Sequence, residues 1–381
     1  MRITAPAGKI ASSLALLASA AREHKTKPAL GVVRIEAKDG EISFAGTDLD
    51  ISISASVASE VEVIEPGRAA PAYDRFAALI GGFAGNAVLI ISATETGISI
   101  TPQGSRATYR LPCLAQDTLP VMPAIDTATG EIKLTAPEFL RLLEPVAAVS
   151  TEKTRYFLCA VFLQTVGREL IATGADGLKL IRVATAADSF SETRDCVIPS
   201  SAITALRGLF TRSKPELVTM QRSLRLFTVI TSGFEFTTKL VEAGPTGYPE
   251  TDRAIPKPAA NPLNVSRVDL MAALHRLAAV AVVGDTPLVT LSAGDGQLTI
   301  RLSRQPADDG CDHIVADGNL DKIVAPIKPL VGMLGEFNAE RVGLEAVSGV
   351  SPLVIRETGK LGLIARAQWK DGEMPANAAM V

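Results

Sequence analysis

A long internal repeat is the feature that most limits how this chain can fold. Three segments with apolar residues at helical spacing surround Leu14, Leu142 and Leu270, and 142 − 14 and 270 − 142 both equal 128. Apolar residues three and four positions apart lie on one face of a helix. We therefore expect an equivalent amphipathic helix near the start of each of three repeats.

Strands and second helices follow nearly the same interval. The strand-like segments "DGEISFAGTD", "GRELIATGAD" and "DGQLTIRLSR" place Glu41, Glu169 and Gln297 128 residues apart. Alternating apolar and polar residues in "NAVLIISATETGISITP" and "SLRLFTVITSGFEFTTKL" predict further strands. A second helix is expected after one proline in each repeat, because proline fits the first turn of a helix, where its missing N–H costs no hydrogen bond. These prolines are Pro71, Pro199 and Pro326.

Each repeat is long enough to be a domain. Solenoid units have about 20–50 residues, whereas this chain has 381 residues, 47% of them hydrophobic, for three repeats. The predicted fold class is therefore α+β, with three tandem repeats that form domains at 1–124, 125–256 and 257–381. The segments "TLPVMPAIDTATGE" and "AIPKPAANPLN", rich in proline and small polar residues, are the expected linkers.

Charge and cysteine content exclude several classes of protein. A net charge of −3 and a pI near 5.8 argue against phosphate binding across the whole surface, although one face can still be basic. The four cysteines lie far apart and form no Cys-x-x-Cys pair, so neither a zinc site nor a disulfide framework is indicated, and buried free thiols are expected. These cysteines are Cys113, Cys159, Cys196 and Cys311.

Nothing in the sequence indicates a membrane protein or an exported one. No run of 18 apolar residues occurs, so no transmembrane helix is expected. The alanine-rich N-terminus is interrupted by Ser12, Ser13 and Ser19 and recurs later in the chain, which favours an amphipathic helix over an export signal. We expect a cytoplasmic protein.

The pattern of polar residues gives little support to an enzyme. His24, His275 and His313 are far apart in sequence, which argues against a histidine metal site or a catalytic triad and favours surface positions. The "GGFAG" segment follows a predicted helix, so it indicates a helix-ending turn and no nucleotide-binding loop. Asp48 and Asp176 recur 128 residues apart and would lie in different domains, which favours turn roles over a hydrolase that uses them. No catalytic residue, metal or cofactor is predicted.

Longer segments resemble one protein family. The first repeat's "KPALGVVRIEAKDGEISFAGTDLDISI" and the second repeat's "TRYFLCAVFLQTVGRELIATGADGLKLI" and "FTTKLVEAGPTGYPETDRAIP" are similar to bacterial DNA polymerase III beta subunits, the DNA sliding clamps. The resemblance covers nearly the full length. It implies three clamp domains in each chain of a homodimeric ring, with helices lining the hole and antiparallel sheets outside. Such a non-catalytic ring encircles duplex DNA without sequence preference and tethers the replicative polymerase.

The resemblance also implies which residues face DNA. Carried over by position, they are Arg22, His24, Lys25, Lys27, Lys153 and Arg155. The alternative is that these are solvated cations favoured at helix ends. Where family members often carry basic residues at the start of each second helix, this chain has Tyr73-Asp74-Arg75 and Ser200-Ser201. We therefore expect a weaker positive charge around the DNA.

Clamp partners, including the polymerase III catalytic subunit and the clamp loader, insert an extended peptide into an apolar pocket between the second and third domains. The implied wall residues are Leu158, Ala175, Gly177, Leu178, Leu180, Pro249, Arg253, Ala254, Val350 and Ile364. Leu178 and Lys179 replace the histidine and arginine common in the family, and the usual methionine–proline–methionine ending is missing. Leu158, Leu178 and Leu180 could alternatively be plain core residues.

Subunit contacts in the family join the first domain of one chain to the third domain of the other. Opposite charges suit this: Arg106 and Arg110 lie on a late strand of the first domain, and Asp308, Asp309 and Asp312 follow a strand of the third. Ordinary surface charges are the alternative, because exposed ion pairs contribute only about 0–1 kcal/mol. The departures from the family pattern also leave open a divergent clamp paralogue that serves repair or a plasmid.

Overall fold

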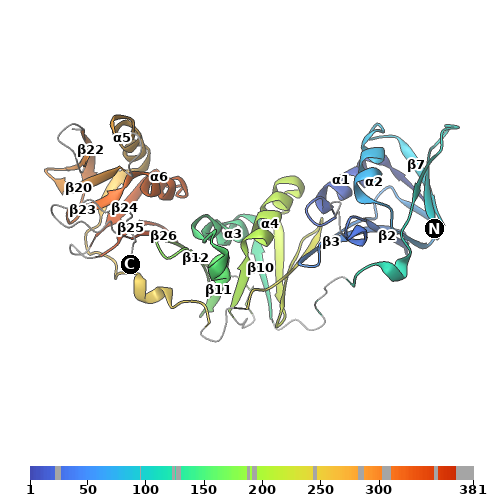
Figure 1. The fold of residues 1–381 in the computed structure, drawn as a ribbon, viewed down its shortest axis with the longest axis horizontal. Coiled ribbons are helices and arrows are strands. Elements are labelled where there is room, and N and C mark those ends of the chain that lie inside the picture. Colours follow the sequence, from blue (N-terminus) through green and yellow to red (C-terminus); the bar gives the residue numbers. More distant parts are fainter. Residues whose placement is uncertain are drawn as a thin grey trace. The chain divides into compact units, whose positions relative to one another are not determined.

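The computed structural model describes residues 1–21, 27–94, 96–121, 125, 130–186, 189–190, 195–242, 247–281, 287–302, 310–346 and 351–365 (Figure 1). The chain divides into two compact units, described separately below. The N-terminal unit comprises Met1–Leu140 and Ala187–Val241, and the C-terminal unit comprises Arg141–Ala186 and Glu242–Val381. The second repeat contributes to both units, and the predicted domain boundaries stay a prediction.

Six α-helices occur in the described residues. They are α1 (Ala7–Leu17), α2 (Tyr73–Gly81), α3 (Ala136–Leu142), α4 (Ser200–Ser213), α5 (Arg267–Val280) and α6 (Ile327–Gly335). Short 3₁₀ helices are η1 (Pro28–Leu30), η2 (Gln116–Thr118), η3 (Glu144–Ala148), η4 (Lys153–Leu158) and η5 (Thr251–Ala254). None of the described helices is long and apolar enough to span a bilayer.

The N-terminal unit contains two antiparallel sheets. One has the order β5-β1-β7-β8-β9, with β1 (Arg2–Pro6), β5 (Glu62–Glu65), β7 (Val88–Ala93), β8 (Gly97–Pro102) and β9 (Tyr109–Pro112). The other has the order β14-β10-β16-β17-β18-β4-β3-β2-β6. Its strands are β14 (Ser189–Phe190), β10 (Gly130–Thr135), β16 (Leu217–Arg222), β17 (Leu226–Ile230), β18 (Glu235–Lys239), β4 (Ile51–Val57), β3 (Glu41–Thr47), β2 (Arg34–Lys38) and β6 (Gly67–Ala69). This unit also contains β15 (Cys196–Pro199).

A long antiparallel sheet runs through the C-terminal unit in the order β11-β12-β13-β26-β25-β24-β19-β22-β21-β20-β23. Its second-repeat strands are β11 (Ala160–Val166), β12 (Glu169–Ala175) and β13 (Lys179–Ala186). Its third-repeat strands are β19 (Leu263–Ser266), β20 (Leu288–Gly294), β21 (Gln297–Leu302), β22 (Cys311–Asp317), β23 (Ile323–Pro326), β24 (Arg341–Glu345), β25 (Leu353–Glu357) and β26 (Lys360–Ile364). Strands of two repeats therefore share one hydrogen-bonded sheet.

The predicted interval of 128 residues is confirmed at three hairpins. Glu41, Glu169 and Gln297 are the first residues of β3, β12 and β21. Each follows a two-residue turn that begins at positive φ: Asp39-Gly40 at 51° and 81°, Gly167 at 62°, and Asp295-Gly296 at 52° and 73°. Such turns match the right-handed twist of the strands that they join. The residues of these turns therefore set where the equivalent strand begins in each repeat.

The interval is only approximate at the first helices. Leu14, Leu142 and Leu270 are all buried, as predicted. They stand seven, six and three residues after the first residues of α1, α3 and α5, which are Ala7, Ala136 and Arg267. Residues three and seven positions after the start of a helix are about one turn apart and lie on the same face. The leucines therefore stay buried although their distance from the helix start differs.

The predicted second helices are present, but their prolines lie just outside them. α4 and α6 begin directly after Pro199 and Pro326, which are the N-caps with extended backbones. α2 begins two residues after Pro71. The prediction that a second helix begins after each proline is confirmed, and the prolines precede the helices, a place that their fixed φ also suits. The prediction of a helix-ending turn at "GGFAG" is confirmed, since α2 ends at Gly81.

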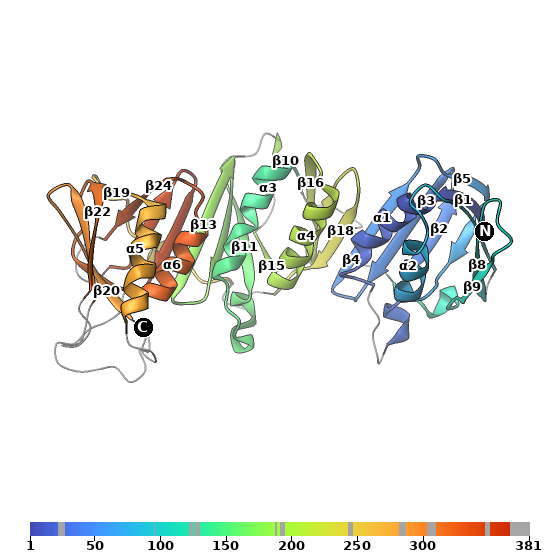
Figure 2. The ribbon, with the colours of Figure 1, turned by 90° about the horizontal axis from the view of Figure 1, so that it is seen from above.

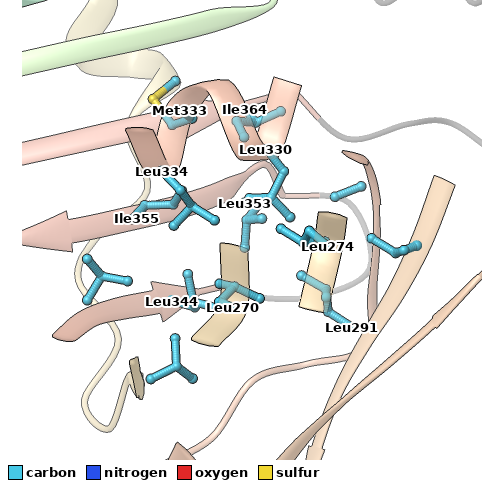
Figure 3. Packing of buried hydrophobic residues seen from close by; sticks show 14 of the residues in the cluster. Leu270, Leu274, Leu291, Leu330, Met333, Leu334, Leu344, Leu353, Ile355 and Ile364 are labelled. Carbon is cyan, nitrogen blue, oxygen red and sulfur yellow. The ribbon is translucent and has the colours of Figure 1, made fainter. Parts of the chain in front are cut away.

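Amphipathic helices cover the sheet in the third repeat. α5 and α6 lie side by side and pack on it (Figure 2). Leu270 and Leu274 from α5 meet Leu330 and Leu334 from α6 above Leu344, Leu353 and Ile355 of the strands (Figure 3). The predicted linker "AIPKPAANPLN" has no strand before Leu263, whereas most of the first predicted linker lies outside the described residues.

Candidate functional site

Two strands from different repeats meet at the site. β13 pairs with β26 in the C-terminal unit, with Leu180 opposite Leu363 and Arg182 opposite Leu361. Main-chain hydrogen bonds of this ladder fix which side chains face each other across the junction. The second and third repeats therefore contribute to one continuous surface.

A small apolar cluster lies on one face of this ladder. Ala175, Leu180 and Leu363 are 8%, 4% and 7% exposed, and the half-buried Ile255 and Leu361 pack against them. Leu158, at the end of η4, is also buried. Buried positions for Leu158 and Leu180 are compatible with the floor of a pocket. They are equally compatible with the alternative from the sequence, in which both are ordinary core residues.

Leu363, which the sequence did not single out, lies beside Leu180 in place of the predicted Ile364. Ile364, predicted as a third-domain wall residue, is 2% exposed and belongs to the large core under α6 (Figure 3). The residue beside Leu180 is Leu363. Successive strand residues face opposite sides of a sheet, so an error of one position moves a side chain from one surface to the other. Val350, the other predicted wall residue of the third domain, lies outside the described residues.

The turn between β12 and β13 presents Leu178 to solvent. The Asp176 Oδ1 atom accepts hydrogen bonds from the backbone N–H groups of Leu178 and Lys179, both at 2.8 Å. Gly177 has φ +93°, a left-handed conformation that suits glycine. The Leu178 carbonyl accepts the N–H of Ala365 at 2.7 Å. With its backbone held in this way, the Leu178 side chain is 41% exposed, which excludes a core role for it.

The first repeat contains the same turn with different chemistry. Asp48 Oδ1 accepts the N–H groups of Asp50 and Ile51 at 2.9 and 2.8 Å, so the predicted turn role of Asp48 and Asp176 is confirmed. The Thr47 hydroxyl donates to the Ile51 carbonyl at 2.7 Å and accepts the Leu49 N–H at 3.0 Å. Since 175 − 47 is 128, Ala175 is the counterpart of Thr47. The second repeat therefore has an apolar methyl group where the first has a hydroxyl that is hydrogen-bonded within its own turn.

Arg182 fastens the neighbouring segment to β13. Its guanidinium lies 2.5 Å from Asp252 and donates to the Thr251 hydroxyl at 2.8 Å and to the Thr173 hydroxyl at 3.2 Å. These contacts hold η5 beside the apolar cluster. The predicted wall residues Pro249, Arg253 and Ala254 are exposed on this segment. Charge-assisted hydrogen bonds of this kind fix geometry as well as adding stability.

Tyr248 anchors the start of the same segment. It is 7% exposed and stacks on Phe162, with 4.7 Å between ring centroids. Burial raises the pKa of Tyr248 to about 12. Sequence reasoning missed Tyr248 and Arg182; the aromatic residue before Pro249 was a visible signal for the first, whereas nothing local marks the second.

Cations around the turn do not all face the same way. The Lys179 ammonium donates to the Ala147 carbonyl of η3 at 2.7 Å, so it is committed within the chain. Arg253 pairs with Glu250 at 2.6 Å. Arg155, predicted to face DNA, is exposed on η4, and its Nη1 atom lies 3.7 Å from where a Cβ on Gly177 would stand. Arg155 therefore lies beside the turn that presents Leu178.

The other residues predicted to face DNA are only partly described. Arg22, His24 and Lys25 lie outside the described residues, as does the side chain of Lys153, which opens η4. Lys27 is exposed just before η1.

The charges predicted for subunit contact fall into two groups. Arg110 is exposed on β9, the last strand of its sheet, while Arg106 precedes β9, so its predicted place on the strand was wrong. Asp308 and Asp309 lie outside the described residues. Asp312 pairs with Arg276 of the same chain at 2.7 Å, which takes up part of its charge.

Histidine and cysteine side chains of the described residues form no metal-binding group. The described residues include no group of three His, Cys, Asp or Glu side chains that could hold a metal ion. His275 and His313 are exposed, as predicted. All four cysteines are free, but only Cys196 is buried, and the exposed Cys311 contradicts the expectation of buried thiols.

Comparisons with known proteins agree across the chain. The family models for the N-terminal and central domains of the DNA polymerase III beta subunit match residues 1–123 and 133–250. The "Beta sliding clamp" of Caulobacter vibrioides (strain NA1000 / CB15N) is 23% identical over 93% of this chain and 95% of that protein. The protein of the same name from Pseudomonas putida is 24% identical over 94% and 96%.

Solved structures show the same fold. A sliding clamp from Bartonella birtlesii, crystallised with griselimycin, superposes with a TM-score of 0.83 and 22% identity over 97% of this chain and all of that one. The Bacillus subtilis clamp gives a TM-score of 0.84, again with 22% identity over 97% of this chain.

Proposed function

The chain belongs to the family of bacterial DNA polymerase III beta subunits, the non-catalytic DNA sliding clamps, and we propose that two copies close into a ring around duplex DNA. A head-to-tail contact whose rotation closes gives a finite ring instead of a filament. The edge strand β9 supports this proposal, because it carries Arg110 at the rim of the first repeat's sheet. In the ring, helices line the hole, sheets face outward, and Arg106, Arg110, Asp308, Asp309 and Asp312 lie near the subunit contact.

The apolar cluster of Ala175, Leu180 and Leu363, together with the exposed Leu178 on the turn between β12 and β13, is the observation that carries the partner site. An extended peptide with apolar side chains covers Leu178 and reaches the cluster, while η5 forms one wall. Buried apolar anchors in such a pocket supply most of the binding energy of a peptide. The partners are the polymerase III catalytic subunit, the clamp loader and other proteins with a clamp-binding segment.

Retention of the ring on DNA is topological. A net charge of −3 is compatible with a closed ring, which needs few phosphate contacts to stay on DNA. Cations such as Lys27 centre the duplex without reading its sequence. Arg155 lies close enough to the Leu178 turn to contact a bound partner as well. A protein that tethers the replicative polymerase to the chromosome works in the cytoplasm.

The test is retention on circular against linearised DNA after loading, with the mass measured by light scattering. We expect a dimer that stays on circles and leaves cut ends, and an Arg110→Glu variant that is weaker as a dimer and lost from both DNAs. The matched control is Arg225→Glu, an exposed change in the turn between β16 and β17, away from the proposed subunit contact and from the helices. A monomer, or equal loss from both DNAs by the unaltered chain, would contradict the ring.

A divergent clamp for repair or a plasmid is the second candidate. It is favoured by the exposed Leu178 and the internally bonded Lys179, which give this pocket an apolar rim. A labelled peptide from the clamp-binding segment of the polymerase III catalytic subunit separates the candidates. Tight binding supports the replicative role, and binding only by repair-polymerase peptides supports the divergent one.

A further inference from the structure

A cysteine and a histidine share the outward face of β22. Cys311 and His313 are two residues apart on this strand and both are exposed, while the intervening Asp312 and the following Ile314 face the opposite side. Val315, next on the outward face, is 80% exposed. Alternate strand residues point the same way, so the thiol and the imidazole are neighbours in front of the sheet.

The two side chains are within hydrogen-bonding distance. Cys311 Sγ lies 3.6 Å from His313 Nε2. On the other side of the ring, His313 Nδ1 lies 3.1 Å from the Thr299 hydroxyl. Thr299 stands opposite His313 in the β21–β22 ladder, so the backbone register sets this contact. When Nδ1–H donates to Thr299, Nε2 is left as an acceptor for the thiol proton.

The other three thiols lack such a partner in the described part of the chain. Cys196 is buried, and burial raises its pKa to about 12. Burial also raises the pKa of the half-buried Cys113. The Cys159 thiol donates to the Glu152 carbonyl at 3.4 Å, and a carbonyl oxygen cannot take the proton away. Only Cys311 combines exposure with a nitrogen base.

We propose that Cys311 is a thiol-modification site at which His313 acts as the base and a low-molecular-weight disulfide is the reactant. His313 Nε2 takes the thiol proton, and Cys311 Sγ attacks one sulfur of the disulfide. A new S–S bond forms to Cys311 while the original S–S bond breaks. The second sulfur leaves with the bonding electron pair as a thiolate and is protonated by solvent. Thr299 is a positioning residue that orients the imidazole.

This site is separate from the proposed partner surface. None of Cys311, His313 and Thr299 belongs to the cluster of Ala175, Leu180 and Leu363. A reactive cysteine next to a base and open to solvent is the microenvironment that thiol–disulfide exchange requires. The proposal therefore does not depend on peptide binding, whereas Asp312, between Cys311 and His313 on β22, is one of the residues proposed near the subunit contact.

The experiment measures the reaction rate of each cysteine in the full chain, using glutathione disulfide and the aromatic disulfide dithiobis(nitrobenzoate), with peptide mass spectrometry to assign the sites. We expect Cys311 to react first. His313→Asn should slow Cys311 about tenfold, less than the roughly hundredfold effect of a positioned base in a closed active site. Thr299→Val should give a smaller decrease. Cys159 should keep its rate in both variants.

His275→Asn is the matched control, because His275 is an exposed histidine on α5. It should leave all four cysteine rates unchanged. Exposure alone could make Cys311 fast, so the histidine variants decide the outcome. If Cys311 keeps its rate in both His313→Asn and His313→Gln, with unchanged circular dichroism, the proposed base is wrong. If Cys311 reacts no faster than Cys159, the site itself is refuted.

Discussion

The Lys360 ammonium lies 2.5 Å from a carboxylate oxygen of Glu144, although 216 residues separate the two positions. The Lys360 side chain is fully buried and also donates to the Glu336 carbonyl. Its ammonium lies 5.1 Å from the centre of the Phe337 ring. Glu144 belongs to η3 of the second repeat and Lys360 to β26 of the third, so the pair joins the two repeats.

Removal of Lys360 should destabilise the C-terminal unit. Lys360→Met leaves the Glu144 carboxylate without its counter-charge in a mostly buried place, and we expect a loss of about 3 kcal/mol in the free energy of unfolding. The double variant Lys360→Met/Glu144→Gln should recover much of that loss. Lys38→Met is the control, because Lys38 and Asp39 form an exposed pair. Urea unfolding is the measurement, and a loss below about 1 kcal/mol for Lys360→Met would refute the argument.

Leu178 should contribute to peptide affinity without contributing to stability. Because its side chain is 41% exposed, Leu178→Ala should leave the unfolding midpoint unchanged. Loss of the apolar contact should weaken binding about tenfold, as expected for one leucine covered by a ligand. Fluorescence anisotropy with the labelled polymerase peptide checks this. Leu224→Ala, at a 71% exposed leucine of the N-terminal unit, should bind normally, and equal affinities of the two variants would remove Leu178 from the site.

The shared turn of the first two repeats makes a prediction about backbone strain. Leu49 has φ +81° where Gly177 has φ +93°. Leu49→Gly should be more stable than Leu49→Ala by about 1 kcal/mol, because both lose the side chain beyond Cβ and only alanine keeps the Cβ that causes the left-handed penalty. Gly177→Ala should lose a similar amount, since a Cβ there meets nothing closer than 3.7 Å and backbone strain is the only cost.

Thermal unfolding of these variants is the measurement. Gly81→Ala is the control, because Gly81 ends α2 without a positive φ and has open space around its Cβ position. It should show no loss of stability. A Gly177→Ala variant as stable as the unaltered chain would show that the turn tolerates any residue.

Alkaline stability should depend on Cys196. Burial raises the pKa of this thiol from 9.0 to about 12. Below the unfolded value the thiol is neutral in both states, whereas above it the unfolded chain releases the proton first. Stability therefore falls as the pH rises from about 9 towards 12, because the unfolded state then binds fewer protons than the native state.

Melting temperatures between about pH 8 and pH 11 test this dependence. Cys196→Ala should have a lower melting temperature at neutral pH but a shallower decline above about pH 9, and the exposed Cys311→Ala should follow the unaltered chain. Burial also raises the pKa of Tyr248 to about 12. Tyr248 therefore lowers the melting temperature of all three proteins in the same pH range. Parallel curves for all three would exclude Cys196 as a source.

Local chemistry made much of the fold predictable. Asp39-Gly40 and Asp295-Gly296 specify tight turns by themselves, so strands begin at Glu41 and Gln297 as the interval of 128 indicated. Apolar spacing placed Leu14, Leu142 and Leu270 in helices with buried faces. These features depend on neighbours within a few residues, and the sequence shows such neighbours directly.

Contacts between distant strands were not predictable in this way. Leu363 rather than Ile364 stands beside Leu180, because the register of β13 and β26 decides which face each residue takes. Arg182 reaches Thr251 and Asp252 across 69 or more residues, and Lys179 turns inward to Ala147. Charge and spacing in the sequence do not distinguish these arginine and lysine side chains from solvated ones.

The first two repeats contain two versions of one turn, and the version at the proposed peptide site lacks a hydroxyl group. The Thr47 hydroxyl closes the first turn by donating one hydrogen bond and accepting another, whereas the Ala175 methyl can do neither. The second copy thereby lacks one hydroxyl with its two hydrogen bonds and has a methyl group at that position. At the proposed peptide site, a methyl group with no directional hydrogen bond would allow apolar side chains of different shapes to pack against it.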